Sequence, residues 1–193
     1  MMGNIGIYAG TFDPIHKGHI EFALSAIEKA NLDRVILLPE RCPRRKLNVT
    51  PFADRIEMLK LAAQISPKLE VVALKQDQFT VTKTLPELQR RFGHKIVLLV
   101  GSDEAKHLER WPDLKVLIAQ VDLCVGLRAG DSRVAIEALL TAQGWRFICI
   151  AAGATGHIAS RSIRLQGQRG FIDPHVQSYI TANKLYPLAF PTN

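Results

Sequence analysis

The stretch GTFDPIHKGHI, residues 10–20, lies between two segments of opposite character. Residues 4–9 form a short apolar run with β-branched and aromatic side chains, which favours a strand. Residues 21–30 combine good helix formers with apolar side chains at helical spacing. The stretch is therefore predicted to be a strand-to-helix turn. In an open parallel sheet such a turn lies at the carboxyl edge of the strands, where ligands bind.

The composition of this turn indicates a phosphate site. Gly10 lets the backbone pass close to a ligand or adopt a positive φ, and Pro14 stiffens the loop. Gly18 leaves room beside the first turn of the following helix, whose free N–H groups and positive dipole end can bind an anion. His16 and His19 are three residues apart, so both imidazoles can point at the same anion and donate to a phosphoryl oxygen.

Each part of this motif also has a simpler interpretation. A glycine-rich turn after a strand is often only a turn, and two histidines at this spacing could bind a metal. No third ligand lies nearby in the sequence, however, and two side chains do not complete a zinc site. The whole string is far more specific than its parts. It matches the G-x-F-x-P-x-H-x-G-H signature of the nucleotidyltransferase superfamily at Gly10, Phe12, Pro14, His16, Gly18 and His19. With Thr11 and Asp13 included, it resembles the nicotinate-nucleotide adenylyltransferases.

Composition limits the class of protein. The chain has 193 residues, 47% of them hydrophobic and 22% charged, which suits one soluble α/β domain spanning residues 1–193. No apolar run approaches the length of a membrane span, and no signal-peptide pattern precedes the first strand. We therefore expect a cytoplasmic protein with no membrane partner. Three widely spaced cysteines make disulfides and a C-x-x-C metal site unexpected.

The net charge of +7 indicates anionic partners, and both nucleotides and nucleic acids qualify. The basic residues are spread along the chain apart from a cluster at Arg41, Arg44, Arg45 and Lys46. Only 7% of residues are aromatic, which leaves few platforms for stacking bases, and no nucleic-acid-binding motif is present. A nucleotide is therefore the expected partner, whereas the sequence leaves the oligomeric state open.

Apolar runs alternate with helical patterns along most of the chain. Strands are expected at residues 5–9, 34–38, 69–73, 95–100, 123–127 and 146–150. Helices are expected at residues 20–30, 52–65, 81–92, 113–119, 132–143, 161–166 and 174–183. This alternation predicts an α/β fold, a doubly wound parallel sheet with helices on both faces. The family resemblance implies the Rossmann-like nucleotidyltransferase version of it, with a C-terminal helical extension.

The loop after the second expected strand is basic. Its string Pro43-Arg44-Arg45-Lys46 stands where the family has a P-P-H-K-like string whose last residue reaches the substrate phosphate. Lys46 keeps that cation, while Arg44 and Arg45 replace a Pro and a His. A short basic loop by itself is more often solvated than functional. Arg55 then opens an amphipathic helix as in the family, and a helix-surface position explains it equally well.

The segment FTVTKTLPEL, residues 79–88, resembles the family's T-x-D-T-L helix start. The resemblance implies that Thr84 contacts the acceptor nucleotide. Capping of this helix by Thr82 or Thr84 is the simpler explanation. Lys83 replaces the Asp of the family, which reverses the charge beside the expected pocket.

Two further strand ends resemble the family's acceptor site. In residues 97–111 a G-x-D string is followed eight residues later by Trp111, which implies that Asp103 binds ribose or amide groups and that Trp111 stacks on the pyridine ring. An N-cap role for Asp103 and a core position for Trp111 are the alternatives. Arg128 matches the R of the family's R-P-G string, in which Ala129 replaces the Pro.

The segment IASRSIR, residues 158–164, resembles the second superfamily signature, I-S-S-T-x-I-R. Ser160 can cap a helix whose N-terminus faces the triphosphate, and Arg164, one turn later, offers a fork for phosphate oxygens. Ala159 replaces a Ser of the signature, and Ser162 stands where the family usually has Thr. A plain capped helix is the alternative interpretation.

Together these resemblances imply transfer of AMP from ATP to nicotinate mononucleotide, giving deamido-NAD and pyrophosphate. Mg²⁺ would bridge the triphosphate oxygens, held mainly by phosphate and water. The implied catalytic residues are His16, His19, Lys46 and Arg164; the ATP contacts are Gly10, Thr11, Phe12, Gly18, Ser160 and Ser162; the acceptor contacts are Thr84, Asp103, Trp111 and Arg128. Another phosphorylated acceptor (nicotinamide mononucleotide, pantetheine phosphate or flavin mononucleotide), CTP as donor, and a non-catalytic nucleotide- or RNA-binding protein remain open.

Overall fold

The computed structural model describes residues 4–44, 46–151 and 153–187. In this part of the chain six strands form one sheet in the order β3-β2-β1-β4-β5-β6, and every neighbouring pair is parallel. The strands are β1 (Ile5–Gly10), β2 (Arg34–Pro39), β3 (Leu69–Val71), β4 (Ile96–Gly101), β5 (Val121–Gly126) and β6 (Phe147–Ile150). The strand order reverses between β1 and β4, which creates the crevice where open α/β sheets bind ligands. The predicted doubly wound fold is confirmed.

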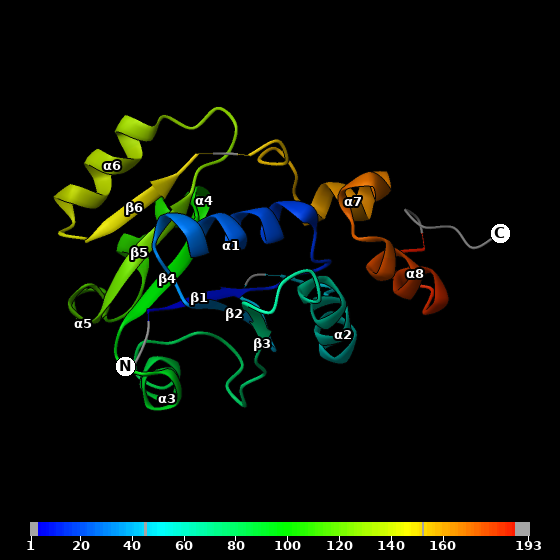
Figure 1. Cartoon of the computed structure of the whole chain (residues 1–193), viewed down its shortest axis with the longest axis horizontal. Coiled ribbons are helices and arrows are strands. Elements are labelled where there is room, and N and C mark those ends of the chain that lie inside the picture. Colours follow the sequence, from blue (N-terminus) through cyan, green and yellow to red (C-terminus); the bar gives the residue numbers. More distant parts are fainter. Residues whose placement is uncertain (1–3, 45, 152, 188–193) are drawn as a thin grey trace.

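The helices cover both faces of this sheet (Figure 1). They are α1 (Lys17–Lys29), α2 (Phe52–Ala63), α3 (Thr84–Phe92), α4 (Ser102–Ala105), α5 (Leu114–Gln120), α6 (Arg133–Ala142), α7 (Ser160–Gln166) and α8 (Pro174–Ala182), with short 3₁₀ turns η1 (Leu108–Arg110) and η2 (Arg169–Phe171). One core cluster joins the sheet to α3, α5 and α6, and a second joins it to α1, α2, α7 and α8. Figure 1 shows α7 and α8 together at the end of the molecule beside α2, the predicted C-terminal extension.

The central strands are apolar on both faces because helices cover both. In β2, Ile36 and Leu38 belong to the first core cluster, whereas Val35 and Leu37 belong to the second. This is the two-residue alternation of a strand. A strand buried on both sides reads as a continuous apolar run, which is why the strands could be located from the sequence.

The structure differs from the predicted elements mainly at their ends. Helix α3 begins at Thr84 rather than residue 81, because residues 81–83 form a turn. Strand β3 is shorter than predicted, and α4 was not predicted because it is a single turn directly after β4. Across the described ranges, the helices are all too short or too polar to cross a bilayer.

Candidate active site

A cavity of about 830 Å³ lies at the carboxyl edge of the sheet. Its walls come from the turn after β1, one side of α1 from Gly18 to Glu28, the loop around residues 46–49 and the segment 153–164. Strands β1, β4 and β5 end in Gly10, Gly101 and Gly126, and all three glycines line the cavity. A side chain at Gly126 would strike the ring of Phe22, at 2.9 Å from the added carbon. The cavity has the size of a site for a small molecule such as a nucleotide.

His16 and His19 lie together at the start of α1, as their spacing predicts. Their ring centroids are 3.7 Å apart. The backbone N–H of His16 donates to Nδ1 of His19 over 3.3 Å. A neutral imidazole that accepts at Nδ1 carries its proton on Nε2, so His19 presents an Nε2–H donor.

Both imidazoles are held in the neutral form. Burial, assisted by the Arg128 charge, lowers the pKa of His16 to about 4. Burial also holds the pKa of His19 well below its usual value, with further contributions from His16, Arg128 and Lys46. At neutral pH the pair therefore offers hydrogen-bond donors, while the positive charge of the site comes from Arg and Lys side chains.

Aromatic packing and one glycine fix the position of these rings. Phe12 contacts His19 edge-on at a centroid distance of 5.2 Å, and Tyr8 packs edge-on against Phe12 at 5.3 Å. At Gly18 an added Cβ would lie 3.1 Å from the His16 ring and 3.2 Å from the Thr155 carbonyl oxygen. The absence of a side chain at Gly18 therefore leaves the room that the sequence indicated. Gly10, by contrast, does not use a positive φ.

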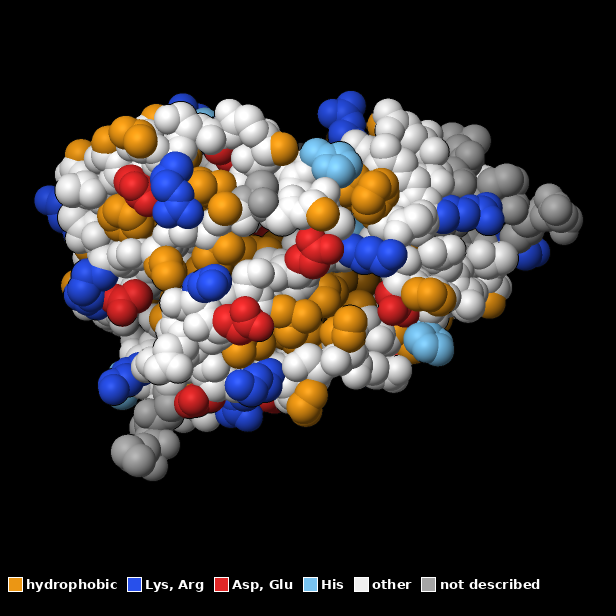
Figure 2. Space-filling model, turned by 45° about the horizontal axis from the view of Figure 1, so that its top comes forward, with side chains coloured by type: hydrophobic (Ala, Val, Ile, Leu, Met, Phe, Trp, Pro, Cys, Tyr) orange, Lys and Arg blue, Asp and Glu red, His pale blue; other side chains and the backbone are white. Residues whose placement is uncertain are grey.

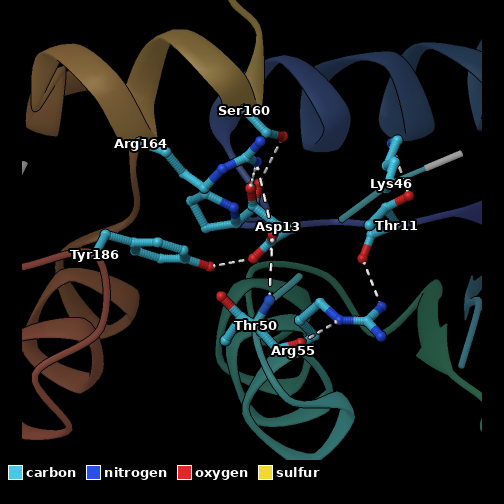
Figure 3. Close-up of polar contacts among 9 residues, drawn as sticks. Thr11, Asp13, Lys46, Thr50, Arg55, Ser160, Arg164 and Tyr186 are labelled. Atoms are coloured by element: carbon cyan, nitrogen blue, oxygen red, sulfur yellow. Dashed lines mark hydrogen bonds and ion pairs between the residues drawn. The ribbon is translucent and has the colours of Figure 1, made fainter. Parts of the chain in front are cut away.

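Lys46 and Arg55 hold Thr11, another residue of the first motif. Nζ of Lys46 donates to the Thr11 hydroxyl over 2.7 Å, so the basic loop reaches the turn (Figure 3). Arg55 is only 1% exposed, and its guanidinium donates to the carbonyl oxygens of Thr11, Glu40, Arg41 and Thr50 at 2.8 to 3.1 Å. The helix-surface interpretation of Arg55 is therefore wrong, because the buried side chain ties three backbone segments together.

The two signatures meet at Asp13. Arg164 donates to the backbone oxygen of Asp13 and lies 3.6 Å from its carboxylate. The hydroxyl of Ser160 donates to the Pro14 carbonyl oxygen over 2.9 Å. Ala159, rather than Ser160, is the N-cap residue of α7, so the predicted cap is wrong. Ser160 and Arg164 line the cavity, whereas Ser162 is absent from its lining.

Two residues expected at the acceptor side form an ion pair. Nε of Arg128, two residues after β5, lies 2.8 Å from Oδ2 of Asp103, in α4. Gly101 is the N-cap residue of α4, which excludes that simpler role for Asp103. Arg128 also lines the cavity. The pair therefore joins two strand ends beside the histidines.

Thr84 and Trp111 lie away from the cavity lining. Thr84 is 1% exposed; its hydroxyl donates to the Gln78 carbonyl oxygen and accepts from the Thr80 N–H. Neither Thr82 nor Thr84 caps α3; Thr80 Oγ1 instead accepts from the N–H groups of Lys83 and Thr84. Trp111 packs against the first core cluster, and its Nε1–H donates to Glu104 over 2.7 Å. Their contacts with an acceptor stay predictions.

The basic loop is only partly a cavity wall. Arg44 donates to the Gln78 side chain and to the Phe79 carbonyl oxygen, which ties the loop after β2 to the loop before α3. Lys83 is exposed. Arg45 lies outside the described residues.

Among the described residues no group of three or more His, Cys, Asp or Glu side chains is arranged to hold a metal.

The comparisons with known proteins agree with this geometry. The cytidylyltransferase-like family model matches residues 7–166. The chain belongs to the cytidylyltransferase-like family. Within that family it is 36% identical to the nicotinate-nucleotide adenylyltransferase of Bacillus subtilis over 123 residues, 61% of this chain and 65% of that protein, slightly less than two thirds of its length. It is 30% identical to a probable nicotinate-nucleotide adenylyltransferase of Neisseria meningitidis serogroup C over 195 residues, 96% of this chain and 99% of that one. The resemblance drawn from the motifs is confirmed.

A solved structure with the same fold is the Plasmodium falciparum nicotinic acid mononucleotide adenylyltransferase complexed with NaAD. The TM-score is 0.79 at 20% identity, over 96% of this chain and 98% of that one. This similarity in fold extends over nearly the whole cytidylyltransferase-like chain.

Proposed function

We propose that this chain transfers AMP from ATP to nicotinate mononucleotide, forming deamido-NAD and pyrophosphate in NAD biosynthesis. The observation that carries the proposal is the closely packed, neutral His16–His19 pair in a cavity at the sheet's switch point. The relatives named as nicotinate-nucleotide adenylyltransferases support the choice of acceptor. We propose further that residues 1–193 act as one domain in the cytoplasm.

The chemistry needs positioning and charge neutralisation rather than a protein nucleophile. The acceptor's phosphate oxygen attacks the α-phosphorus of ATP, the bond to the bridging oxygen breaks, and pyrophosphate leaves with its electron pair. His19 Nε2–H donates to the oxygens on which charge grows, and Lys46 and Arg164 neutralise the triphosphate. Gly10, Thr11, Phe12, Gly18, Ser160 and Ser162 complete the proposed ATP site.

Mg²⁺ is proposed to enter with ATP as its magnesium complex. Magnesium keeps several waters and is commonly held by substrate phosphates with only one or two carboxylates. The cavity is lined by four basic side chains (Lys46, Arg128, Arg161 and Arg164) and three acidic ones (Asp13, Glu21 and Glu28), and among the described residues no three His, Cys, Asp or Glu side chains are grouped to hold a metal. We therefore assign no residue of this chain as a metal ligand.

The acceptor side is proposed to use Asp103, Arg128, Trp111 and Thr84. The Asp103–Arg128 pair supports this side, because Arg128 lines the cavity and pairs with the Asp103 carboxylate. Arg44, Arg45 and Lys83 depart from the family pattern, which keeps other phosphorylated acceptors as a second candidate.

The proposal is tested with purified protein, Mg²⁺, and ATP or CTP against a panel of acceptors. The panel contains nicotinate mononucleotide, nicotinamide mononucleotide, pantetheine phosphate and flavin mononucleotide. We expect pyrophosphate release with ATP and nicotinate mononucleotide, with deamido-NAD as the product by mass spectrometry. Release with another acceptor alone would correct the substrate, and no release with any acceptor would refute the enzyme class.

A nucleic-acid-binding protein without catalysis is the alternative from a different class. The face drawn in Figure 2 shows Lys and Arg side chains scattered among acidic ones rather than gathered into one basic patch. Tight, salt-dependent RNA binding without pyrophosphate release would favour this alternative.

A further inference from the structure

The segment after α8 returns to the first signature. The phenol of Tyr186 donates to Oδ1 of Asp13 over 2.6 Å, across 173 positions of sequence (Figure 3). Asp13 is only 3% exposed, so its carboxylate depends on protein donors. The family model ends at residue 166, so the matched region does not include Tyr186.

Asp13 connects this tyrosine to the cavity. Its other carboxylate oxygen, Oδ2, accepts from the Thr50 N–H at 3.4 Å and lies 3.6 Å from Nη1 of Arg164. Nη1 of Arg164 also donates to the backbone oxygen of Asp13. The Asp13 carboxylate thus has the phenol on one oxygen and the guanidinium on the other.

The chemistry of the Tyr186 phenol and of the Arg164 guanidinium would allow the phenol to influence the position of the guanidinium through Asp13. Burial, followed by the Asp13 charge, holds the pKa of the Tyr186 phenol well above its usual value, so the group remains a donor throughout the physiological range. Arg164 lines the cavity with a side chain that is 32% exposed. One edge of its guanidinium is therefore fixed by Asp13, while the rest is available to phosphate oxygens.

We propose that Tyr186 is a positioning residue for ATP binding, which holds the Asp13 carboxylate in the place that orients Arg164 toward the triphosphate. This inference rests on the proposed function, because it assumes that the cavity takes ATP. It extends the site to the C-terminal segment and assigns the conformation of the signature turn partly to a residue outside both signatures.

A purely structural role is the competing explanation, because Tyr186 also packs against the second core cluster. Tyr179 provides a matched control. It lies in α8 and donates its hydroxyl to Asp54 of α2 over 2.8 Å, so it also anchors the C-terminal region by one Tyr–Asp bond. Neither Tyr179 nor Asp54 lines the cavity.

The test is calorimetric titration of Mg-ATP, without acceptor, into wild type, Tyr186→Phe, Tyr179→Phe, Arg164→Ala and the Tyr186→Phe/Arg164→Ala double variant. We expect Tyr186→Phe to raise the Kd for ATP about tenfold, the lower end for a hydrogen bond to a charged group. Tyr179→Phe should stay within about twofold of wild type. In the Arg164→Ala background Tyr186→Phe should add less than about twofold, because two residues acting through one contact are not additive.

An unchanged Kd in Tyr186→Phe, or the same tenfold loss with and without Arg164, would overturn the proposal. Asp13→Asn is the second variant if Tyr186→Phe does not fold. It should weaken ATP binding at least tenfold, and wild-type affinity in Asp13→Asn would also overturn the proposal. Failure of the proposed function is distinguishable, because it shows in wild-type turnover with nicotinate mononucleotide rather than in these affinities.

Discussion

The two sides of the cavity are built differently. On the side of the first signature, Asp13, His16 and Arg55 are at most 6% exposed and are held by hydrogen bonds or ring contacts from several elements. At the ends of β4 and β5 the corresponding feature is one ion pair. The side chains of Asp103 and Arg128 in that pair are 61% and 44% exposed.

This contrast follows from what each side is proposed to do. Donors that stabilise charge in a transition state contribute most when they are already in place, so the triphosphate side benefits from buried, fixed groups. An exposed ion pair contributes little to stability and can rearrange when a ligand arrives. Substitutions on the first side should therefore cost more than those on the second.

The largest effect is expected from His19→Ala. The change removes the Nε2–H donor at the start of α1 and should lower kcat by roughly 10²–10³-fold, as loss of one preorganised donor does. The KM for ATP should change less, because the donor helps the transition state more than bound ATP. Steady-state kinetics on folded protein measures both quantities.

His19→Gln is the companion variant, since its amide can place a donor near the position of Nε2. It should retain more activity than His19→Ala. A folded His19→Ala protein with near-normal kcat would remove the histidine from the proposed mechanism.

The second effect is a pH dependence of stability from His16. Its folded pKa of about 4 lies below the usual 6.5, so between these values the unfolded chain binds the proton more readily. The stabilisation is complete above pH 6.5 and is lost progressively toward pH 4, by on the order of 2–3 kcal/mol. Denaturant titrations of wild type and His16→Gln at pH 7 and 4.5 measure it.

The His16→Gln protein should lose less stability on acidification than wild type. His94→Gln, which removes an exposed imidazole before β4, is the matched control and should keep the wild-type dependence. If the free energy of unfolding falls equally from pH 7 to 4.5 in wild type and His16→Gln, burial of this ring does not govern the acid sensitivity.

A smaller effect is expected from Trp111→Ala on the acceptor side. The variant should weaken nicotinate mononucleotide binding by about 2- to 10-fold, the range for loss of one aromatic stack, and ATP binding by less. Separate titrations of the two substrates measure the two losses of affinity. Trp111→Phe should restore most of the lost affinity for nicotinate mononucleotide. Equal losses for both substrates would identify Trp111 as a core residue only.

The smallest effect is expected from Asp103→Asn on stability. The substitution breaks the exposed pair with Arg128 and should change the free energy of unfolding by less than about 1 kcal/mol. Denaturant titration should show this small change together with weaker acceptor binding. A large loss of stability would contradict the description of this side as open.

The two sides also differ in how far the sequence predicted them. The His16–His19 juxtaposition follows from spacing and the strand positions follow from buried apolar runs, because both signals are local. The Tyr186–Asp13 bond joins residues 173 apart, which no local pattern encodes. Arg55 was open to a surface interpretation because an arginine on an amphipathic helix is usually solvated. Its four carbonyl partners come from three separate segments.

Thr80, Thr84 and Ser160 show a related limit. Each has a hydroxyl that could cap a helix, and the sequence does not say which backbone group that hydroxyl reaches. In the structure Thr80 Oγ1 accepts from the N–H groups of Lys83 and Thr84, Thr84 bonds the loop before α3, and Ser160 bonds Pro14. The choice depends on tertiary packing.

The central claim is that the donor nucleotide binds on the side of the first signature. A crystal structure with a non-hydrolysable ATP analogue and nicotinate mononucleotide tests it most directly. The account predicts phosphate oxygens within hydrogen-bond distance of His19 Nε2 and of the Arg164 guanidinium, with the acceptor toward Asp103 and Arg128. A triphosphate bound outside this cavity, for example on the exposed Arg44 and Lys83 side chains, would contradict it.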